Sequence, residues 1–137
     1  MLADGYELIE QTPPIDDYRR LRVVAGLSPK SEAAALRGLP NTWFAVVVRK
    51  DGEAVGMGRI IGDGGLFFQI VDMAVEPTHQ GRGLGKAIMA ALVERLRTGA
   101  RGAYVSLIAD GEAHRLYAQY GFEPTAPVSI GMAMVIP

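Results

Sequence analysis

A glycine-rich segment, Gln80-Gly81-Arg82-Gly83-Leu84-Gly85, has the residue types and spacing of an anion-binding loop. Glycines at alternate positions let the backbone approach a ligand closely, and a helix is expected to begin at Leu84. The first turn of a helix has unpaired N–H groups and the positive end of the helix dipole, which suit a pyrophosphate. Arg82 and Lys86 add positive charge at the same place. The segment therefore predicts a site for a phosphorylated ligand.

Two other interpretations of this segment stay open. Glycine clusters between a strand and a helix are often only turns. A dinucleotide-binding fold is the second alternative, and it requires an acidic residue about 20 positions after the glycines. The next expected strand, Tyr104 to Ala109, contains no acid, and Asp110 follows about 25 positions after the last glycine, so it fits that fingerprint poorly.

The elements expected around the segment follow from hydrophobic periodicity and from glycine and proline breaks. Strands are expected at Tyr6–Glu10, Trp43–Arg49, Glu53–Ile61, Leu66–Val75, Tyr104–Ala109 and Ser129–Ile136. Helices are expected at Ile15–Ala25, Ser31–Arg37, Leu84 to Gly99 and Glu112–Tyr120. The three strands in the middle form an antiparallel meander. This order predicts one domain over residues 1–137 with a mixed α/β sheet.

The composition of the chain argues against several classes of function. The chain has 137 residues with a formal net charge of -1, so no basic field points to nucleic acid or to an anionic membrane. It has no cysteine and two histidines, His79 and His114, which gives no basis for a thiolate nucleophile or a metal site. No apolar run approaches the length of a membrane span. We therefore expect a soluble, cytoplasmic protein that binds no metal, nucleic acid or membrane.

Two motifs in order resemble the GNAT superfamily of acetyl-CoA-dependent N-acetyltransferases. The segment from Gln80 to Gly85 matches the Gln/Arg-x-x-Gly-x-Gly/Ala signature of that family, and Met73-Ala74-Val75-Glu76-Pro77 matches the apolar strand before it. The stretch from Asp110 to Tyr117, followed by Gly121-Phe122, matches the later Asn-x-x-Ala-x-x-Leu-Tyr-x-x-x-Gly-Phe pattern. The resemblance implies an acyl-CoA N-acyltransferase fold, with a mostly antiparallel sheet, a splayed pair of parallel strands and flanking helices.

The resemblance also implies which residues bind acetyl-CoA. The loop amides would hold the pyrophosphate, and the main chain at Met73, Ala74 and Val75 would pair with the pantetheine arm in a slot facing Tyr104–Ala109. The cofactor set implied in this way is Met73, Ala74, Val75, Gln80, Gly81, Arg82, Gly83, Leu84, Gly85, Lys86, Asp110 and Tyr117. Asp110 stands where the family often has Asn, so it lacks the amide donor of that residue.

Tyr117 stands where the family places a general acid that protonates the departing thiolate. From spacing alone Tyr117 can equally be an ordinary aromatic at the edge of the core, because Leu116 and Tyr120 share its helix face. The glutamate bases of family members correspond to Gln69 and Val105 here, and neither side chain can take a proton.

A base for the acceptor amine therefore has to come from another residue. Asp72, in an apolar strand, is the first candidate, ahead of His79, Glu76 or a chain of water molecules. Asp72 can also be a structural carboxylate, and an amine with a lowered pKa needs no dedicated base.

The acceptor is expected to be a primary amine of a small molecule, a protein lysine or an N-terminal amine. Trp43, Phe67 and Phe68 are candidates for an apolar wall of its site, although aromatic residues in strands are also typical of a core. Two other function classes stay open. One is a weakly catalytic, acyl-CoA-binding regulator, and the other is an interaction module in which Ser129–Ile136 pairs across the edge of a homodimer.

Overall fold

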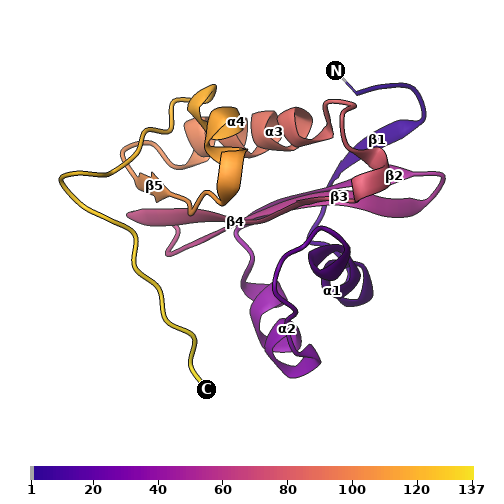
Figure 1. Ribbon diagram of the computed structural model, residues 1–137, viewed down its shortest axis with the longest axis horizontal. Helices are drawn as coiled ribbons and strands as arrows, with labels where there is room; N and C mark the ends of the chain where they lie inside the picture. Colours follow the sequence, from indigo (N-terminus) through magenta and orange to yellow (C-terminus); the bar gives the residue numbers. More distant parts are fainter. Residues whose placement is uncertain (1) are drawn as a thin grey trace.

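The computed structural model describes residues 2–137 and builds them around a five-stranded sheet in the order β1-β2-β3-β4-β5 (Figure 1). The strands are β1 (Tyr6–Glu10), β2 (Phe44–Lys50), β3 (Glu53–Gly62), β4 (Phe67–Val75) and β5 (Tyr104–Ser106). The helices are α1 (Ile15–Val24), α2 (Glu32–Gly38), α3 (Leu84–Gly99) and α4 (His114–Ala118), with 3-10 turns η1 (Leu39–Asn41), η2 (Pro77–His79) and η3 (Gly111–Ala113). The first four strands are antiparallel neighbours, and β5 runs parallel to β4.

The β2–β3 turn forms at the predicted place. Asp51 and Gly52 both have positive φ angles, 51° and 83°, as a two-residue type I′ hairpin turn requires. The predicted meander is therefore confirmed.

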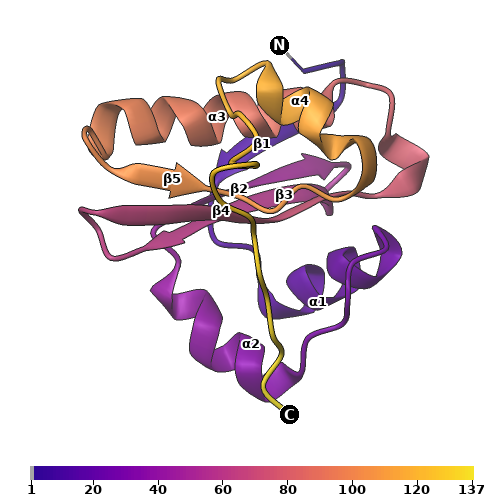
Figure 2. The ribbon, with the colours of Figure 1, turned by 60° about the vertical axis from the view of Figure 1, so that its left-hand side comes forward.

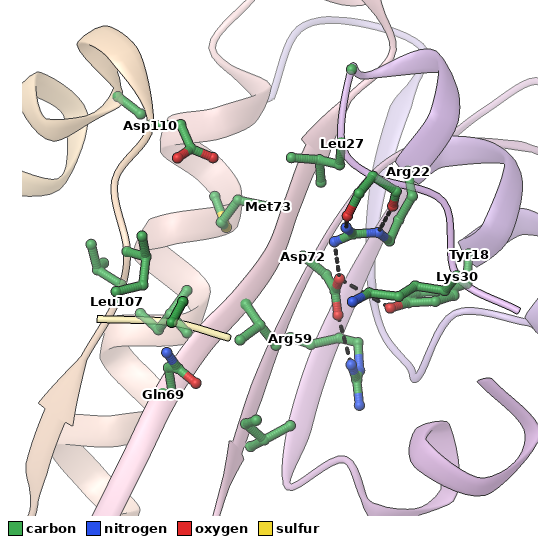
Figure 3. A pocket seen from close by; sticks show the side chains of 18 of the residues that line it. Tyr18, Arg22, Leu27, Lys30, Arg59, Gln69, Asp72, Met73, Leu107 and Asp110 are labelled. Carbon is green, nitrogen blue, oxygen red and sulfur yellow. Dashed lines mark hydrogen bonds and ion pairs between the residues drawn. The ribbon is translucent and has the colours of Figure 1, made fainter. Parts of the chain in front are cut away.

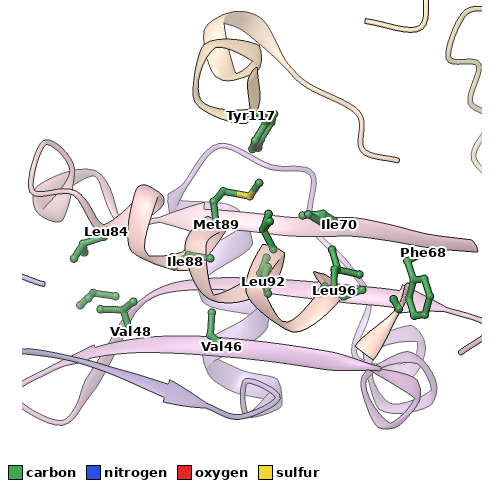
Figure 4. Packing of buried hydrophobic residues seen from close by; sticks show 14 residues of the cluster. Val46, Val48, Phe68, Ile70, Leu84, Ile88, Met89, Leu92, Leu96 and Tyr117 are labelled. Carbon is green, nitrogen blue, oxygen red and sulfur yellow. The ribbon is translucent and has the colours of Figure 1, made fainter. Parts of the chain in front are cut away.

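Helices cover both faces of the sheet (Figure 1). The buried stripe of α3, which includes Ile88 and Leu92, packs on Val46 and Val48 of β2 (Figure 4). Val47, between those two residues, faces the opposite way, into the cluster under α1 and α2. The alternation of a strand thus gives one sheet two separate apolar layers.

A β-bulge interrupts the pairing of β3 with β4. The register passes from Met57↔Ala74 to Arg59↔Val71, so Gly58 lies opposite both Asp72 and Met73. A Cβ atom on Gly58 would lie 2.6 Å from Ile88 and 2.8 Å from Met73, so only glycine lets these side chains close over the bulge.

The bulge inverts the alternation of β4. Before it, Phe68 and Ile70 point into the α3 layer, but after it Ala74 points into the α1–α2 layer. Asp72 adopts a φ of 59°, a left-handed conformation that is uncommon outside glycine. The side chain of Asp72 consequently lies on the α1 side instead of in the apolar α3 layer.

The parallel strands β4 and β5 pair over only three residues. The pairs are Phe67↔Tyr104, Phe68↔Val105 and Gln69↔Ser106. Beyond Gln69 no strand pairs with the β5 side of β4 among residues 2–137, and the chain after β5 leads away to η3 and α4. The result is the splayed parallel pair that the resemblance implied.

The predicted strand at Ser129–Ile136 is wrong. These residues form no strand, and their apolar side chains are largely exposed, with Val135 at 91%. A strand needs a partner for its N–H and C=O groups, whereas β5 ends at Ser106 and gives the segment no ladder to extend. The C-terminal segment instead runs from the β5 edge past β4 toward α2 (Figure 2).

Candidate active site

A cleft of about 270 Å³ lies where β4 opens away from β5 and meets the start of α3. Its lining residues are Met73, Ala74, Val75, Gln80, Gly81, Gly83, Leu84, Gly85, Leu116 and Tyr117. Nine of these ten residues belong to the cofactor-binding set that the resemblance implies. Eight of the nine come from β4 and the glycine-rich loop, and the ninth is Tyr117. The fold therefore brings the two sequence motifs together around one cleft.

Two glycines shape the loop at this cleft. Gly81 and Gly83 have φ angles of 79° and 78°, which L side chains rarely adopt. A Cβ atom at either position would meet nothing within 4 Å, so the space above the loop is open. Gly83 also begins α3 without a side-chain cap, so the first-turn N–H groups remain available to a ligand.

The charged side chains predicted beside the loop do not line this cleft. The Arg82 Nη1 atom donates to the Tyr6 hydroxyl at 2.7 Å and to the Thr78 carbonyl at 3.3 Å, which fastens the loop to β1. The same Tyr6 hydroxyl lies 2.7 Å from His79 Nδ1. Lys86 is held only through its carbonyl, which accepts a hydrogen bond from Tyr120 at 2.9 Å.

A larger cleft, of about 800 Å³, lies along β4, with the α1–α2 segment on one side and the chain after β5, including Leu107 and Asp110, on the other (Figure 3). Its polar lining includes Tyr18, Arg22, Lys30, Arg59, Gln69, Asp72 and Asp110. Met73 and Tyr117 line both clefts. The two spaces therefore share a boundary at these two residues.

Asp72 is the centre of a buried ionic cluster in the larger cleft. Its Oδ1 atom accepts hydrogen bonds from Arg22 Nη1 at 2.8 Å and from the Tyr18 hydroxyl at 3.1 Å, and its Oδ2 atom accepts one from Arg59 Nη1 at 2.6 Å. Burial, and secondarily the Asp72 charge, raises the pKa of Tyr18 to about 12, so this phenol keeps its proton. The predicted base thus has both oxygens engaged by donors of the protein itself (Figure 3).

Arg22 and Arg59 are fixed by further contacts. Arg22 donates from Nε to the Ser28 carbonyl at 2.8 Å and from Nη2 to the Ser28 hydroxyl at 2.9 Å. Arg59 donates from Nε to the Thr42 hydroxyl at 2.9 Å. Both guanidinium groups are therefore held rigidly at the wall of the cleft.

The Tyr117 phenol is nearly buried at the boundary of the two clefts. Burial raises the pKa of Tyr117, and the nearby Asp110 carboxylate raises it further. The group consequently stays protonated throughout the neutral range, as a proton donor must. Tyr120, in the turn after α4, instead donates a hydrogen bond to the Lys86 carbonyl.

The aromatic residues predicted for an acceptor wall lie elsewhere. Phe68 is buried in the α3 layer, with its ring centroid 4.5 Å from that of Trp43. Arg95 lies over the Trp43 ring at 4.4 Å. Phe67 is exposed and contacts Tyr104. None of the three lines either cleft.

Four residues of the larger cleft were missed by the sequence analysis: Tyr18, Arg22, Lys30 and Arg59. Two signals for them were present. Arg22 occupies a buried position in the helical spacing of α1, and Arg59 stands in the apolar run of β3. A charged residue in each of two neighbouring strands, Arg59 and Asp72, is typical of a buried pair.

Within residues 2–137, no group of three or more acidic or histidine side chains is arranged to hold a metal ion. Over the same residues, the helices are too short or too polar to cross a membrane.

Comparison with known proteins decides the family. The acetyltransferase (GNAT) domain family matches residues 41–124, which include β2 to β5 and both sequence motifs. This chain belongs to the GNAT acetyltransferase family. The resemblance and the fold class predicted from the sequence are thereby confirmed.

Individual GNAT relatives agree with this assignment. A probable acetyltransferase of meticillin-resistant Staphylococcus aureus is 43% identical, with a TM-score of 0.91 over 96% of this chain and 99% of that chain. GCN5-related N-acetyltransferase 2 of Arabidopsis thaliana is 36% identical over 75 residues, 55% of this chain and 29% of that protein. Mycothiol acetyltransferase of Amycolatopsis mediterranei is 34% identical over 109 residues, 74% of this chain and 36% of that protein. The chain spans less than half the length of the curated relatives it matches.

Proposed function

We propose that this GNAT chain is an acetyl-CoA-dependent N-acetyltransferase that acts on a primary amine of a small molecule, of a lysine side chain or of a protein N-terminus. The observation that carries the proposal is the shared boundary of the two clefts, where Met73 and Tyr117 line both. One cleft has the open amide loop that suits a pyrophosphate, and the other has room for an acceptor. A group bound in the first can therefore meet an amine bound in the second.

The residues of the smaller cleft fit acetyl-CoA, which supplies the activated acetyl thioester when bound. The uncapped N-terminus of α3 and the open space over Gly81 and Gly83 suit the pyrophosphate. The main chain from Met73 to Val75 borders the cleft on the side where β4 has no strand partner, so its polar groups can bind the pantetheine arm.

Tyr117 is proposed to hold the proton for the departing sulfur. Its phenol borders both clefts, and its raised pKa keeps that proton in place at neutral pH. The negative charge of the nearby Asp110 carboxylate is the second cause of the raised pKa, because it disfavours ionisation of the Tyr117 phenol.

The test is turnover of Tyr117→Phe against a panel of primary amines. The expected result is a decrease in kcat of about 10²–10⁴-fold with CoA affinity unchanged, because only proton donation is removed. In the unmodified enzyme kcat should decrease only at a pH above the ordinary phenol pKa of about 10, because the pKa of Tyr117 is raised. Tyr117→Phe should lack this decrease.

Tyr120→Phe is the matched control, since it removes the hydroxyl of a nearby tyrosine, in the turn after α4, that donates to the Lys86 carbonyl. It should retain most of the activity. Equal losses in the two variants, or full activity of Tyr117→Phe, would contradict the proposed proton donor.

A weakly catalytic, acyl-CoA-binding module is the second candidate. It is favoured by the engaged oxygens of Asp72 and by Gln69 and Val105, which stand where the family resemblance implies a glutamate base. Calorimetry with CoA, run beside the amine panel, separates the two candidates. Tight CoA binding without turnover of any amine would favour the module and count against the enzyme.

We also propose a homodimer formed through residues 128–136. This segment alternates apolar residues at Ile130, Met132, Met134 and Ile136, all at least 70% exposed. The sheet edge at β5 is open, and beside it lies an apolar cleft that includes Leu107 and Phe122. One chain thus holds both an unpaired strand-like segment and an edge that can accept one.

A further inference from the structure

The larger cleft has more positive than negative charge on its α1–α2 side. Arg22, Lys30 and Arg59 line it there, and Asp72 is the one carboxylate beside them within residues 2–137. The other lining carboxylate, Asp110, comes from the segment after β5 and lies near Tyr117 (Figure 3). Three cations therefore face one anion.

Two of these cations, Arg22 and Arg59, are largely shielded from water, whereas Lys30 is exposed. The Arg22 and Arg59 side chains are 11% and 8% exposed, and that of Asp72 is 5% exposed. Buried charges require partners, because the desolvation of an unpaired ion is costly. The single charge of Asp72 is shared by two guanidinium groups, so this cluster of three side chains keeps a net positive charge.

Hydrogen-bond donors remain free on the same side. Arg59 uses Nε and Nη1, whereas its Nη2 atom has no hydrogen-bond partner among residues 2–137. The Lys30 ammonium group also has none within the described chain, and Figure 3 shows Lys30 reaching toward Asp72 from the α1–α2 connection. A carboxylate or phosphate is the ligand chemistry that such donors bind best.

We infer that the acceptor is a small molecule carrying a carboxylate or phosphate beside its primary amine, and that Arg59 and Lys30 bind this anionic group. The inference rests on the proposed function. Asp72 is followed at once by Met73, which borders the acetyl-CoA cleft, so the cation cluster lies close to the place of transfer. An anion held there leaves its amine directed toward Met73 and Tyr117.

The excess positive charge also affects the deprotonation of the acceptor amine, for which no base has been assigned. A nearby positive charge disfavours the ammonium form of an amine and so lowers its pKa. An acceptor bound beside Arg22 and Arg59 therefore enters in its neutral, nucleophilic form more readily than it would in water. Asp72, in this arrangement, positions the two arginines.

The experiment compares matched acceptors that differ only in the anionic group. An amino acid is measured against its carboxamide, and phosphoethanolamine against ethanolamine, by acetylation rate and by calorimetric binding in the presence of CoA. The expected kcat/KM is at least about tenfold higher for the anionic member of one pair, the effect of one charge-assisted contact. The pair that shows the difference identifies the group as a carboxylate or as a phosphate.

Lys30→Gln tests the residue directly, because Lys30 makes no contact on which the fold depends. It should lower the kcat/KM of the anionic acceptor about tenfold and leave that of the neutral partner unchanged. Lys50→Gln, a change at the far end of β2, is the matched control and should alter neither. The selective loss is a result that a merely structural role of Lys30 would not produce.

The possible failures are distinguishable. Turnover of amines with no preference for anionic members, or equal losses for both members in Lys30→Gln, would overturn the inference and leave the acetyltransferase standing. CoA binding without any turnover would contradict the proposed function. In that case calorimetry still decides the inference, because absence of anion binding, or binding unaffected by Lys30→Gln, would overturn it.

Discussion

Asp72 combines a left-handed φ of 59° with hydrogen bonds to three side chains from two elements, Tyr18 and Arg22 of α1 and Arg59 of β3. A non-glycine residue in this conformation costs free energy that its surroundings must offset. Here the offset is an ionic cluster that joins α1 to the sheet at the wall of the larger cleft. Asp72 therefore determines both the shape and the charge of this cleft.

The Tyr18–Asp72 contact predicts a pH dependence of stability. The folded chain has a Tyr18 pKa of about 12, against 10.0 for the ordinary group, so the unfolded chain ionises first as the pH rises. This contribution to the free energy of unfolding is intact below pH 10 and is lost between pH 10 and 12, by about 2–3 kcal/mol.

Urea unfolding at pH 8, 10 and 11 measures this effect. Tyr18→Phe should show a smaller decline above pH 10 than the unmodified chain. Tyr104→Phe, at an exposed tyrosine, is the control and should decline like the unmodified chain. Identical declines in all three proteins would refute the assignment.

At the scale of elements, a strand, a loop and a helix together make the smaller cleft, which is the proposed cofactor site. The bulge opposite Gly58 redirects β4, the short β4–β5 pairing leaves its edge open, and α3 begins at that opening. Each of these features is a matter of backbone geometry. Side-chain charge contributes little to this cleft, because Arg82 donates to Tyr6 and so holds the loop in place.

Gly83→Glu is predicted to abolish CoA binding in a folded protein. The new carboxylate would enter the open space at the start of α3 and oppose the phosphates in charge and volume. Calorimetry with CoA measures the loss, and circular dichroism checks the fold.

Gly102→Glu is the matched control for this change. Gly102 has a similar φ of 84° and similarly open surroundings, but it lies in the turn between α3 and β5, away from the cleft. It should carry the same backbone strain and retain CoA binding. Retained affinity in Gly83→Glu, or its equal loss in both variants, would contradict the pyrophosphate site.

At the scale of the whole molecule, the C-terminal segment is the part that the chain leaves uncovered. It crosses from the β5 edge toward α2 (Figure 2), and its residue Ala133 is among those that line the larger cleft. It has several largely exposed apolar side chains, and a cluster of these on a surface is typical of an interaction site.

The proposed homodimer predicts a solution mass twice that of one chain, measured by light scattering after size exclusion. Removal of residues 128–137 should give the monomer mass with the remaining fold retained. Ile130→Asp should weaken the dimer, because it sets a charge in the apolar face of the segment. A monomer mass for the unmodified chain would remove the proposed dimer.

The sequence alone determined the parts of the site that depend on local rules. Alternate glycines before a helical stripe predicted the loop, and the strands predicted at Trp43–Arg49 and Glu53–Ile61 implied the hairpin between them, because turn geometry and periodicity are carried by neighbouring residues. The same holds for the two motifs that identified the family.

Only the tertiary structure decided which face of β4 holds Asp72 and which side chains surround it. Alternation is a local rule, and the bulge that inverts it depends on how Gly58, Met73 and Ile88 pack across three elements. Arg22 and Arg59 are 37 positions apart in the sequence, and they meet at one carboxylate only after α1 folds onto the sheet. Likewise, Ser129–Ile136 has the composition of a strand, but strand formation requires a partner, and within one chain the short β5 supplies none.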